Sequence, residues 1–594
     1  MKLHVKSNGI METETIQKNE ASPKSLMSRK DILLFGMLLF VFCTFTNKTM
    51  AQFAGGSGTT TDPYLISTTE HLVQMYYYLG NANVHFKLSN NIDLTSYLAP
   101  GGAGYNGGAG WNPIGNASNR FSGTFDGAGF KITGLWISRS NTDYIGLFGA
   151  ASGANISNLG VEIAASGVSG RNYIGGLAGY CENTTISNCY VKGNVTGYWT
   201  TGGLVGDNYG GSIVNCYTTS NVNGGLIGGL VGYSSSGTIT ESHATGNVSN
   251  SNFSTIGSVG GLVGCFSFGT LSNCYATGNV DNVNIYTGGL VGEETGGDGV
   301  LACNITNCYA TGNVSGTNSV GGLVGGMRIL DGYSTSIYIS DCYASGNISA
   351  TSNNIGGLVG YQASGTVSKC YATGNVNGND NVGGLVGNKN GTVTNCYSTI
   401  GYVRGNNSIG GLIGSNGGSI SNCYATGNVT GNNNVGGFIG LTGGTINNSF
   451  FDYQTTGQLY AIGGGSGSVN NLIGKSTAEM KTKSTFTSVG WDFTTFWDIN
   501  EGVTYPFFFN EPMGIIEPIQ NDKLHIFPNP VKDDIFIKSL WQIDRVEIYS
   551  LTGDLLLSEN HFIDKISVSA LPRNVYLLKV YTNKGFFTSK ILKE

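Results

Sequence analysis

A short glycine-rich unit recurs along most of this chain and constrains what it can fold into. One copy, Ile355–Val376, reads IGGLVGYQASGTVSKCYATGNV. Its Gly-Gly-Leu-Val-Gly segment returns about ten times at intervals of roughly 25 to 35 residues, a range typical of solenoids. Each copy holds only short apolar runs between glycine or asparagine. Because one copy cannot bury a core alone, neighbouring copies must stack.

Each copy contains three short β-type runs: Gly-Gly-Leu-Val-Gly, a run around Cys-Tyr-Ala-Thr, and Asn-Val. Stacked at about 4.8 Å per rung, these runs would pair with their copies above and below. We expect an all-β chain built on a right-handed parallel β-helix of about eleven rungs, with terminal caps and a small C-terminal β-sandwich. The composition agrees, since 95 of the 594 residues are Gly and only 11% are charged.

The middle run predicts a column of outward tyrosines. Alternation places Cys370 and Ala372 inside and Tyr371 and Thr373 outside. Lys192, which takes the Thr position of its copy, supports this assignment because a lysine is not expected in the core. His243 takes the tyrosine position in another copy. The candidate binding residues on this face are Tyr190, Tyr217, Tyr275, Tyr309, Tyr343, Tyr371, Tyr397 and Tyr424.

Other repeat positions are interpreted as structural. Serine replaces the recurrent cysteine at Ser242 and Ser449, so no disulfide is obligatory and we expect a column of buried free thiols. The Asn of Gly-Asn-Val should sit at a corner, where it tolerates a left-handed backbone and bonds to neighbouring backbone. In the first run, alternation would expose either Leu358 or Val359, and the pattern does not distinguish them.

The flanking regions have different compositions. Residues 1–51 carry the charged, apolar and small-residue regions of a secretory signal peptide, with either Met1 or Met27 as the start. The apolar run is too short for a comfortable membrane span, so the mature chain is expected to have none. The expected parts after it are an N-terminal cap with irregular coils (52–143), the β-helix (144–455), an aromatic-rich C-terminal cap (456–510), a linker (511–522) and a small β-domain (523–594).

The sequence offers little basis for catalysis or for nucleic-acid binding. Lys and Arg do not cluster on the repeats, which argues against nucleic acid as a partner. No His-Glu-x-x-His, no assignable Ser-His-Asp triad and no zinc-finger spacing is found, so we expect a protein that is not an enzyme and needs no cofactor or metal. The six histidines are scattered.

Two insertions between the first and second runs break the repeat, at residues 293–303 and 326–338. On consecutive rungs they should protrude together and bring Glu293, Glu294 and Asp298 into one neighbourhood. Glycan-cleaving enzymes need two acids at a fixed separation, so a glycan-active β-helix enzyme is the alternative function. Solvated loop charges are the simpler interpretation.

Two segments resemble known families. Gly356–Gly360 and its copies resemble the GLUG repeat of bacterial surface proteins, over about half of the chain. That resemblance implies a surface location and an adhesin-like role; family members also accompany an immunoglobulin-cleaving metallopeptidase, whose zinc motif is absent here. The segment Phe527-Pro528-Asn529-Pro530, together with Tyr576 and the basic C-terminus, resembles the sorting domain of type IX secretion cargo. Asn574 departs from it, because the family usually has Gly there.

The sorting-domain resemblance implies the type IX secretion machinery as a partner and a secreted or outer-membrane surface location. The favoured hypothesis is an adhesive or matrix-forming surface rod whose tyrosine face binds host or environmental glycans or matrix proteins. A competing interpretation is that tyrosine stacking only stabilises the sheet. Ice binding through the threonine column is a third option.

Overall fold

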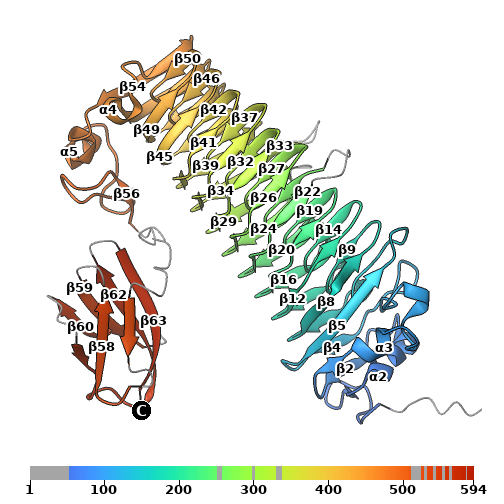
Figure 1. The fold of residues 1–594 in the computed structure, drawn as a ribbon. Helices are drawn as coiled ribbons and strands as arrows, with labels where there is room; N and C mark the ends of the chain where they lie inside the picture. The colour runs from blue at the N-terminus through green and yellow to red at the C-terminus, as the bar shows by residue number, and fades with distance from the viewer. Residues whose placement is uncertain are drawn as a thin grey trace, which may run out of the picture.

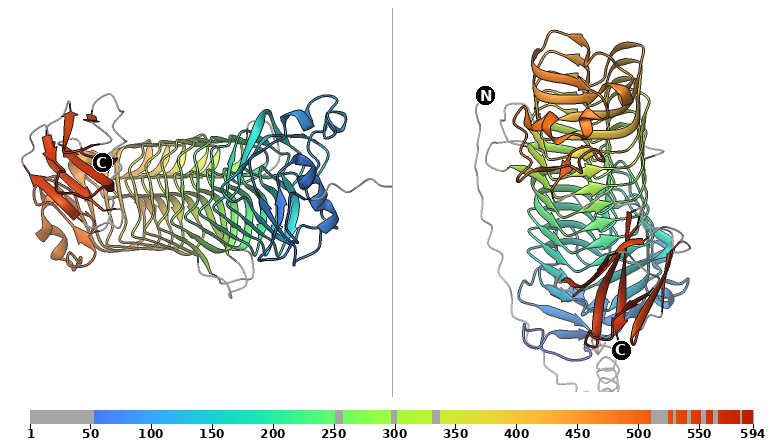
Figure 2. Two further views of the ribbon diagram at one scale, coloured as in Figure 1. Left: turned by 90° about the horizontal axis from the view of Figure 1, so that it is seen from below. Right: turned by 90° about the vertical axis from the view of Figure 1, so that its left-hand side faces the viewer.

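The computed structural model describes the repeat region and most of both flanks. The described residues are 53–509, apart from 251–256, 297–301 and 330–336, and 524–593, apart from 528–530, 540–542, 551–554, 561–564 and 583–584. The expected signal peptide and linker lie outside them. The main body is a long parallel β-solenoid, whose stacked rungs are seen from three sides in Figures 1 and 2. The prediction of an all-β parallel solenoid is confirmed.

A rung consists of up to five short strands rather than three, and in some rungs neighbouring strands merge, as in β20 (Val231–Thr240) and β45 (Tyr397–Arg404). In the copy discussed above these are β37 (Asn353–Gly356), β38 (Val359–Gln362), β39 (Thr366–Ser368), β40 (Tyr371–Ala372) and β41 (Val376–Asn377). Every strand pairs in parallel with its equivalent one rung away, as Tyr371 does with Tyr397. One sheet takes a single strand from each of ten successive rungs, from β9 (Ile174–Gly175) to β50 (Asn433–Gly436).

The Gly-Gly-Leu-Val-Gly segment is a corner, not a strand. It joins β37 to β38, and both Leu358 and Val359 are fully buried. The expectation that one of them faces outward is wrong, because side-chain alternation does not continue across a bend. Glycine is needed here for close approach: a Cβ on Gly357 would lie 2.0 Å from the carbonyl oxygen of Gly384 in the next rung. This contact explains why the glycine pair recurs.

The cysteine column is held by hydrogen bonds rather than by disulfides. The eleven described cysteines are free and buried. The backbone N–H of Cys274 donates to Sγ of Cys308 at 3.4 Å, and the Cys308 thiol donates to the Thr306 carbonyl at 3.1 Å. Where serine replaces cysteine, Oγ of Ser242 accepts from the Cys216 N–H at 3.0 Å. A side-chain acceptor, rather than sulfur itself, is what this position requires.

Cys308→Ser should therefore change the free energy of unfolding by less than about 1 kcal/mol, because the hydroxyl keeps both hydrogen bonds. Cys308→Ala should lower it by about 1–3 kcal/mol, because the buried Cys274 N–H loses its acceptor. Urea denaturation of the two variants beside the parent checks this. Equal losses in both variants would contradict the acceptor role.

The two roles expected of the Gly-Asn-Val asparagine, bonding to neighbouring backbone and adopting a left-handed conformation, belong to two different columns of residues. In the Gly-Asn-Val column, the Asn313 N–H donates to Oδ1 of Asn279 and the Asn347 N–H to Oδ1 of Asn313, each at 3.0 Å. This ladder confirms the expected bonds to neighbouring backbone, but these residues are not among those with positive φ. The left-handed residue instead precedes the cysteine, as with Asn307 at φ 53°. The chain therefore makes its tight turn at the residue just before the inward-facing cysteine.

The coils extend beyond the recognisable repeats at both ends. At the N-terminal end, β1 (Tyr64–Ile66), β2 (His85–Leu88), β4 (Thr124–Asp126) and β7 (Asn155–Ser157) pair in parallel in that order. Helices α2 (Thr69–Gln74) and α3 (Thr95–Leu98) lie at this end (Figure 1). At the other end, β54 (Ser468–Lys475) adds a further strand on β52 (Thr445–Asp452).

After Lys475 the chain forms an aromatic cap, here defined as residues 476–509. It contains helix α5 (Lys483–Thr487) and the antiparallel pair β55 (Trp497–Asp498) and β56 (Phe507–Phe508). Figure 1 shows α5 and β56 beside the last rungs rather than stacked beyond them. Its aromatic side chains form one cluster with Tyr371, Tyr397, Tyr424 and Phe450 of the solenoid. The cap thus packs against the outward tyrosine column.

The C-terminal domain is a small β-sandwich, as expected from the sequence. One sheet holds β57 (Leu524–Phe527), β58 (Asp534–Ser539) and β61 (Lys565–Ser567), and the other holds β59 (Ile543–Tyr549), β60 (Leu555–Asn560), β62 (Asn574–Thr582) and β63 (Gly585–Lys593). Tyr576 is buried, and its hydroxyl donates to the Pro572 carbonyl at 2.8 Å. Residues 528–530 of the expected sorting motif, and the side chain of Phe527, lie outside the described residues.

Candidate binding cleft beside the tyrosine column

The tyrosine column, defined as the eight tyrosines predicted above with His243 among them, is a continuous stack of parallel rings. The Tyr275 and Tyr309 rings have centroids 4.9 Å apart and planes 3° apart, and Tyr309 and Tyr343 follow at 5.0 Å and 5°. His243 continues the stack between Tyr217 and Tyr275. Parallel rings this close are offset-stacked. Each ring face therefore lies largely against its neighbour, and the rims and hydroxyls remain for a partner.

The aromatic cap covers one end of this column. Tyr371, Tyr397 and Tyr424 are only 7%, 5% and 1% exposed. The Phe508 ring lies 5.4 Å from that of Tyr397, and the Trp497 ring lies 6.2 Å from that of Tyr424. The prediction that these three tyrosines are outward binding residues needs correction: they point out of the solenoid but are enclosed by the cap. The other five stay half-buried.

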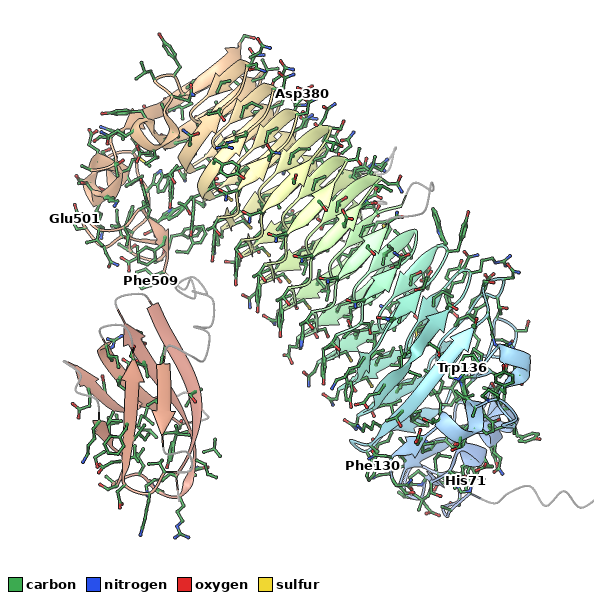
Figure 3. The ribbon with its side chains drawn as sticks, in the orientation of Figure 1. His71, Phe130, Trp136, Asp380, Glu501 and Phe509 are labelled. Carbon is green, nitrogen blue, oxygen red and sulfur yellow. The ribbon has the colours of Figure 1, made fainter. Side chains whose placement is uncertain are left out.

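A cleft of about 740 Å³ opens where the column leaves the cap, within the range of small-molecule sites. Figure 3 labels Phe509 on the cap segment beside this part of the solenoid. One side is formed by the column itself, one by the turn residues that precede the cysteines, and one by cap phenylalanines. The lining side chains used below are Tyr275, Tyr309 and Tyr343; Asn273, Asn307, Asp341 and Lys369; and Phe496, Phe508 and Phe509.

The cleft carries little net charge. Lys369 Nζ lies 3.9 Å from an Asp341 carboxylate oxygen and 4.6 Å from the centroid of the Phe496 ring. Burial raises the pKa of the Tyr275, Tyr309 and Tyr343 phenols, so they remain neutral hydrogen-bond donors. At one end of the cleft, the positive charge of Lys369 and the negative charge of Asp341 offset each other. The arrangement suits an uncharged ligand rich in hydroxyl groups, which can meet both hydroxyl rims and an aromatic wall.

The acids at the first insertion do not form a pair. Glu293 and Glu294 lie in strand β28 (Val291–Gly296), and consecutive strand residues face opposite sides of the sheet. Glu293 points outward, where its carboxylate is 2.7 Å from Nη1 of Arg328 and accepts a hydrogen bond from Oγ of Ser258 at 2.9 Å. Glu294 points into the solenoid and is fully buried. The expectation that both acids project on one loop is therefore wrong, and Asp298 lies outside the described residues.

The sequence interpretation missed the cap side of the cleft. The density of aromatic residues over 490–509 indicated a cap, but nothing in it showed that the cap folds back along the tyrosine column. Lys369 could have been noticed, because it occupies a turn position held by asparagine in most other copies. Within the described residues, no three His, Cys, Asp or Glu side chains are grouped to hold a metal ion. No helix in those residues is long and apolar enough to cross a membrane.

Two curated proteins share part of the sequence. A protein provisionally named a Gly-rich membrane protein, from Evansella cellulosilytica, is 42% identical over 132 residues, which is 20% of this chain and 14% of that protein. Halomucin from Haloquadratum walsbyi is 35% identical over 144 residues, which is 24% of this chain and 2% of halomucin. The chain therefore spans only a small part of the length of these relatives.

Two solved structures also match. A Bacteroides ovatus protein provisionally assigned as an immunoglobulin A1 protease is 19% identical, covering 77% of this chain and 95% of that one at a TM-score of 0.28. An IgA1 protease is 16% identical, covering 58% of this chain and 23% of that one at a TM-score of 0.32.

Family models match both unusual parts of the chain. The model of the GLUG motif matches residues 170–196, 223–249, 256–281, 283–315, 351–377 and 405–430. The model of the secretion system C-terminal sorting domain matches residues 525–594. The sorting domain indicates export by type IX secretion to the cell surface or the medium. The chain thus contains six segments that match the GLUG motif, within a β-solenoid, and a C-terminal segment that matches the secretion sorting domain.

Proposed function

We propose that this exported rod is adhesin-like and binds neutral glycan chains in the cleft between the tyrosine column and the cap. The observation that carries the proposal is the cleft itself, in which phenol hydroxyls repeat at the spacing of the rungs beside cap phenylalanines. A polymer with regularly spaced hydroxyl groups can match such a repeat. The sugar faces would pack on the cap phenylalanines, since the tyrosine faces are occupied by one another.

The placement of the acids does not favour the alternative of a glycan-active enzyme at the insertions. Glycoside hydrolysis uses two carboxyl groups that flank the same bond. Glu293 and Glu294 lie on opposite faces of one sheet, and Glu293 is already paired with Arg328. The adhesin-like role therefore has the better structural support.

Tyr309→Ser should weaken glycan binding by about tenfold, because it removes the ring and reach of a central cleft residue. Tyr217→Ser is the matched control: it sits in the same column with the same stacking but does not line the cleft. Binding of the full chain and both variants to a panel of neutral polysaccharides and matrix proteins is the measurement. Equal loss in both variants, or none in either, would remove the cleft as the binding site.

A further inference from the structure

A second group of side chains lies on another outward face, near the N-terminal rungs. Asp207, in strand β15 (Val205–Tyr209), pairs in register with Tyr180 of β10 (Ala178–Glu182) and with Tyr233 of β20 (Val231–Thr240). Side chains in register on stacked parallel strands lie directly above one another. The Asp207 carboxylate is therefore bracketed by two tyrosines, and Tyr173 lies close enough to feel its charge.

Asp207 has no partner of its own. Among the described residues, no hydrogen bond or ion pair reaches its half-buried carboxylate. Burial alone raises the pKa of Asp207 to about 7, because no nearby positive charge or hydrogen-bond donor stabilises the ionised carboxylate. Arg120 approaches the cluster but is paired with Glu182 and lies 5.0 Å from the Tyr180 ring centroid. A bound cation would supply the positive charge that the Asp207 carboxylate lacks.

Two tyrosines at this face, Tyr173 and its neighbour Tyr144, are in an unfavourable backbone conformation. Tyr144 and Tyr173 adopt φ of 62° and 60°, and their rings stack with centroids 5.0 Å apart. Later rungs place asparagine at this left-handed position, as at Asn354 and Asn381. A bulky residue is disfavoured there, and such exceptions are found at functional sites. The need for a tight turn does not explain the tyrosines.

The same solenoid contains a related arrangement that holds a cation, with the left-handed tyrosine in the same rung as the carboxylate rather than one rung before it, where Tyr173 lies relative to Asp207. Glu293 lies in the same column as Asp207, three rungs further along through Tyr233 and Cys265. Tyr286, at φ 55°, occupies the left-handed position of that rung. There the Arg328 guanidinium pairs with Glu293 at 2.7 Å and lies 5.4 Å from the Tyr286 ring centroid. A carboxylate beside left-handed tyrosine thus holds an organic cation in this fold.

We propose that Asp207, with Tyr173, Tyr180 and Tyr233, forms a binding site for the guanidinium or ammonium group of an external organic cation. The carboxylate supplies the charge complement, and the tyrosine rings supply cation–π attraction. This site is separate from the cleft at the cap and does not depend on the glycan proposal. Methylguanidinium and tetramethylammonium represent the two possible head groups, and tert-butanol is a neutral molecule of similar shape.

Saturation-transfer NMR on the full chain at pH 8, where the Asp207 carboxyl is ionised, tests the site. Saturation is expected for one or both cations and not for tert-butanol; the cation that binds identifies the head group. Asp207→Asn should weaken binding by about tenfold. Glu241→Gln, which removes an exposed carboxylate elsewhere, should leave binding unchanged. Asp207→Asn should also raise the melting temperature, since it removes an uncompensated charge.

Tyr173→Asn provides a second variant that the fold should accept, because other rungs carry asparagine at this position. It should weaken cation binding about threefold to tenfold. Saturation of neither organic cation, equal saturation of tert-butanol, or cation binding unchanged in both variants would overturn the proposal.

Discussion

Replacing Trp497 with alanine is expected to lower the free energy of unfolding by about 3–5 kcal/mol. Trp497 is 1% exposed, and its ring centroid lies 4.7 Å from that of Trp491 and 4.6 Å from that of Phe508. Its removal leaves a cavity where the cap meets Tyr397 and Tyr424, and it weakens the cover over the last rungs. Urea unfolding followed by tyrosine fluorescence measures the change.

Phe509→Ala is the matched control for this prediction, because Phe509 belongs to the same cap but is 55% exposed. Its effect on stability should stay within about 0.5 kcal/mol. A loss for Trp497→Ala no larger than that of Phe509→Ala would show that the cap does not pack on the tyrosine column as described.

Glu294→Gln is expected to make the protein more stable at alkaline pH and to remove a pH dependence. Burial raises the Glu294 pKa to about 8, with the Cys303 side chain acting in the opposite direction. In the unfolded chain a glutamate titrates near pH 4.3. Between these values the folded state keeps a proton that the unfolded state releases, so the stability contribution is complete below about pH 4 and is lost as pH rises to about 8.

The loss between pH 5 and pH 8 should reach about 4 kcal/mol, because stability falls by about 1.4 kcal/mol for each pH unit in this interval. Denaturant unfolding at pH 5 and pH 8 of the parent and of Glu294→Gln measures it, with Glu241→Gln as an exposed control. The effect of Lys389 on the pH dependence of stability has the opposite sign and lies at higher pH. Its pKa is lowered to about 7 by burial, so stability rises with pH from about 7 to 10. An unchanged slope in Glu294→Gln would exclude its buried carboxyl as the source.

The repeat pattern predicted which residues of the strands face inward and outward, but not where the bends between the strands lie. Period-two alternation correctly placed Cys370 and Ala372 inside, and Lys192 is exposed as that register requires. The same rule failed at Leu358 and Val359, because alternation describes an extended strand and these residues flank a bend. Short strands of two to four residues are joined by bends that the hydrophobic pattern does not mark.

Features that depend on distant segments could not be read from one copy. The interior position that holds Glu294 and Lys389 also holds Phe266, Met327 and Gln362 in other rungs. Because residues of such different kinds occupy this position, the sequence alone does not predict that a charged side chain is buried there. Lys389 is accommodated because its Nζ donates to Oδ1 of Asn416 at 2.8 Å and to the Ser419 carbonyl at 3.0 Å. Likewise, the enclosure of Tyr424 depends on a cap that follows it by dozens of residues.

Hydrogen–deuterium exchange of the full chain, with and without the oligosaccharide that binds best in the polysaccharide panel, tests the central claim most directly. If the cleft binds glycan, ligand should slow exchange at residues 340–343 and 495–509 and leave residues 187–190, which are equivalent to 340–343, unchanged. Protection spread evenly along the tyrosine column, or confined to the insertions near Glu293, would contradict the cleft as the binding site.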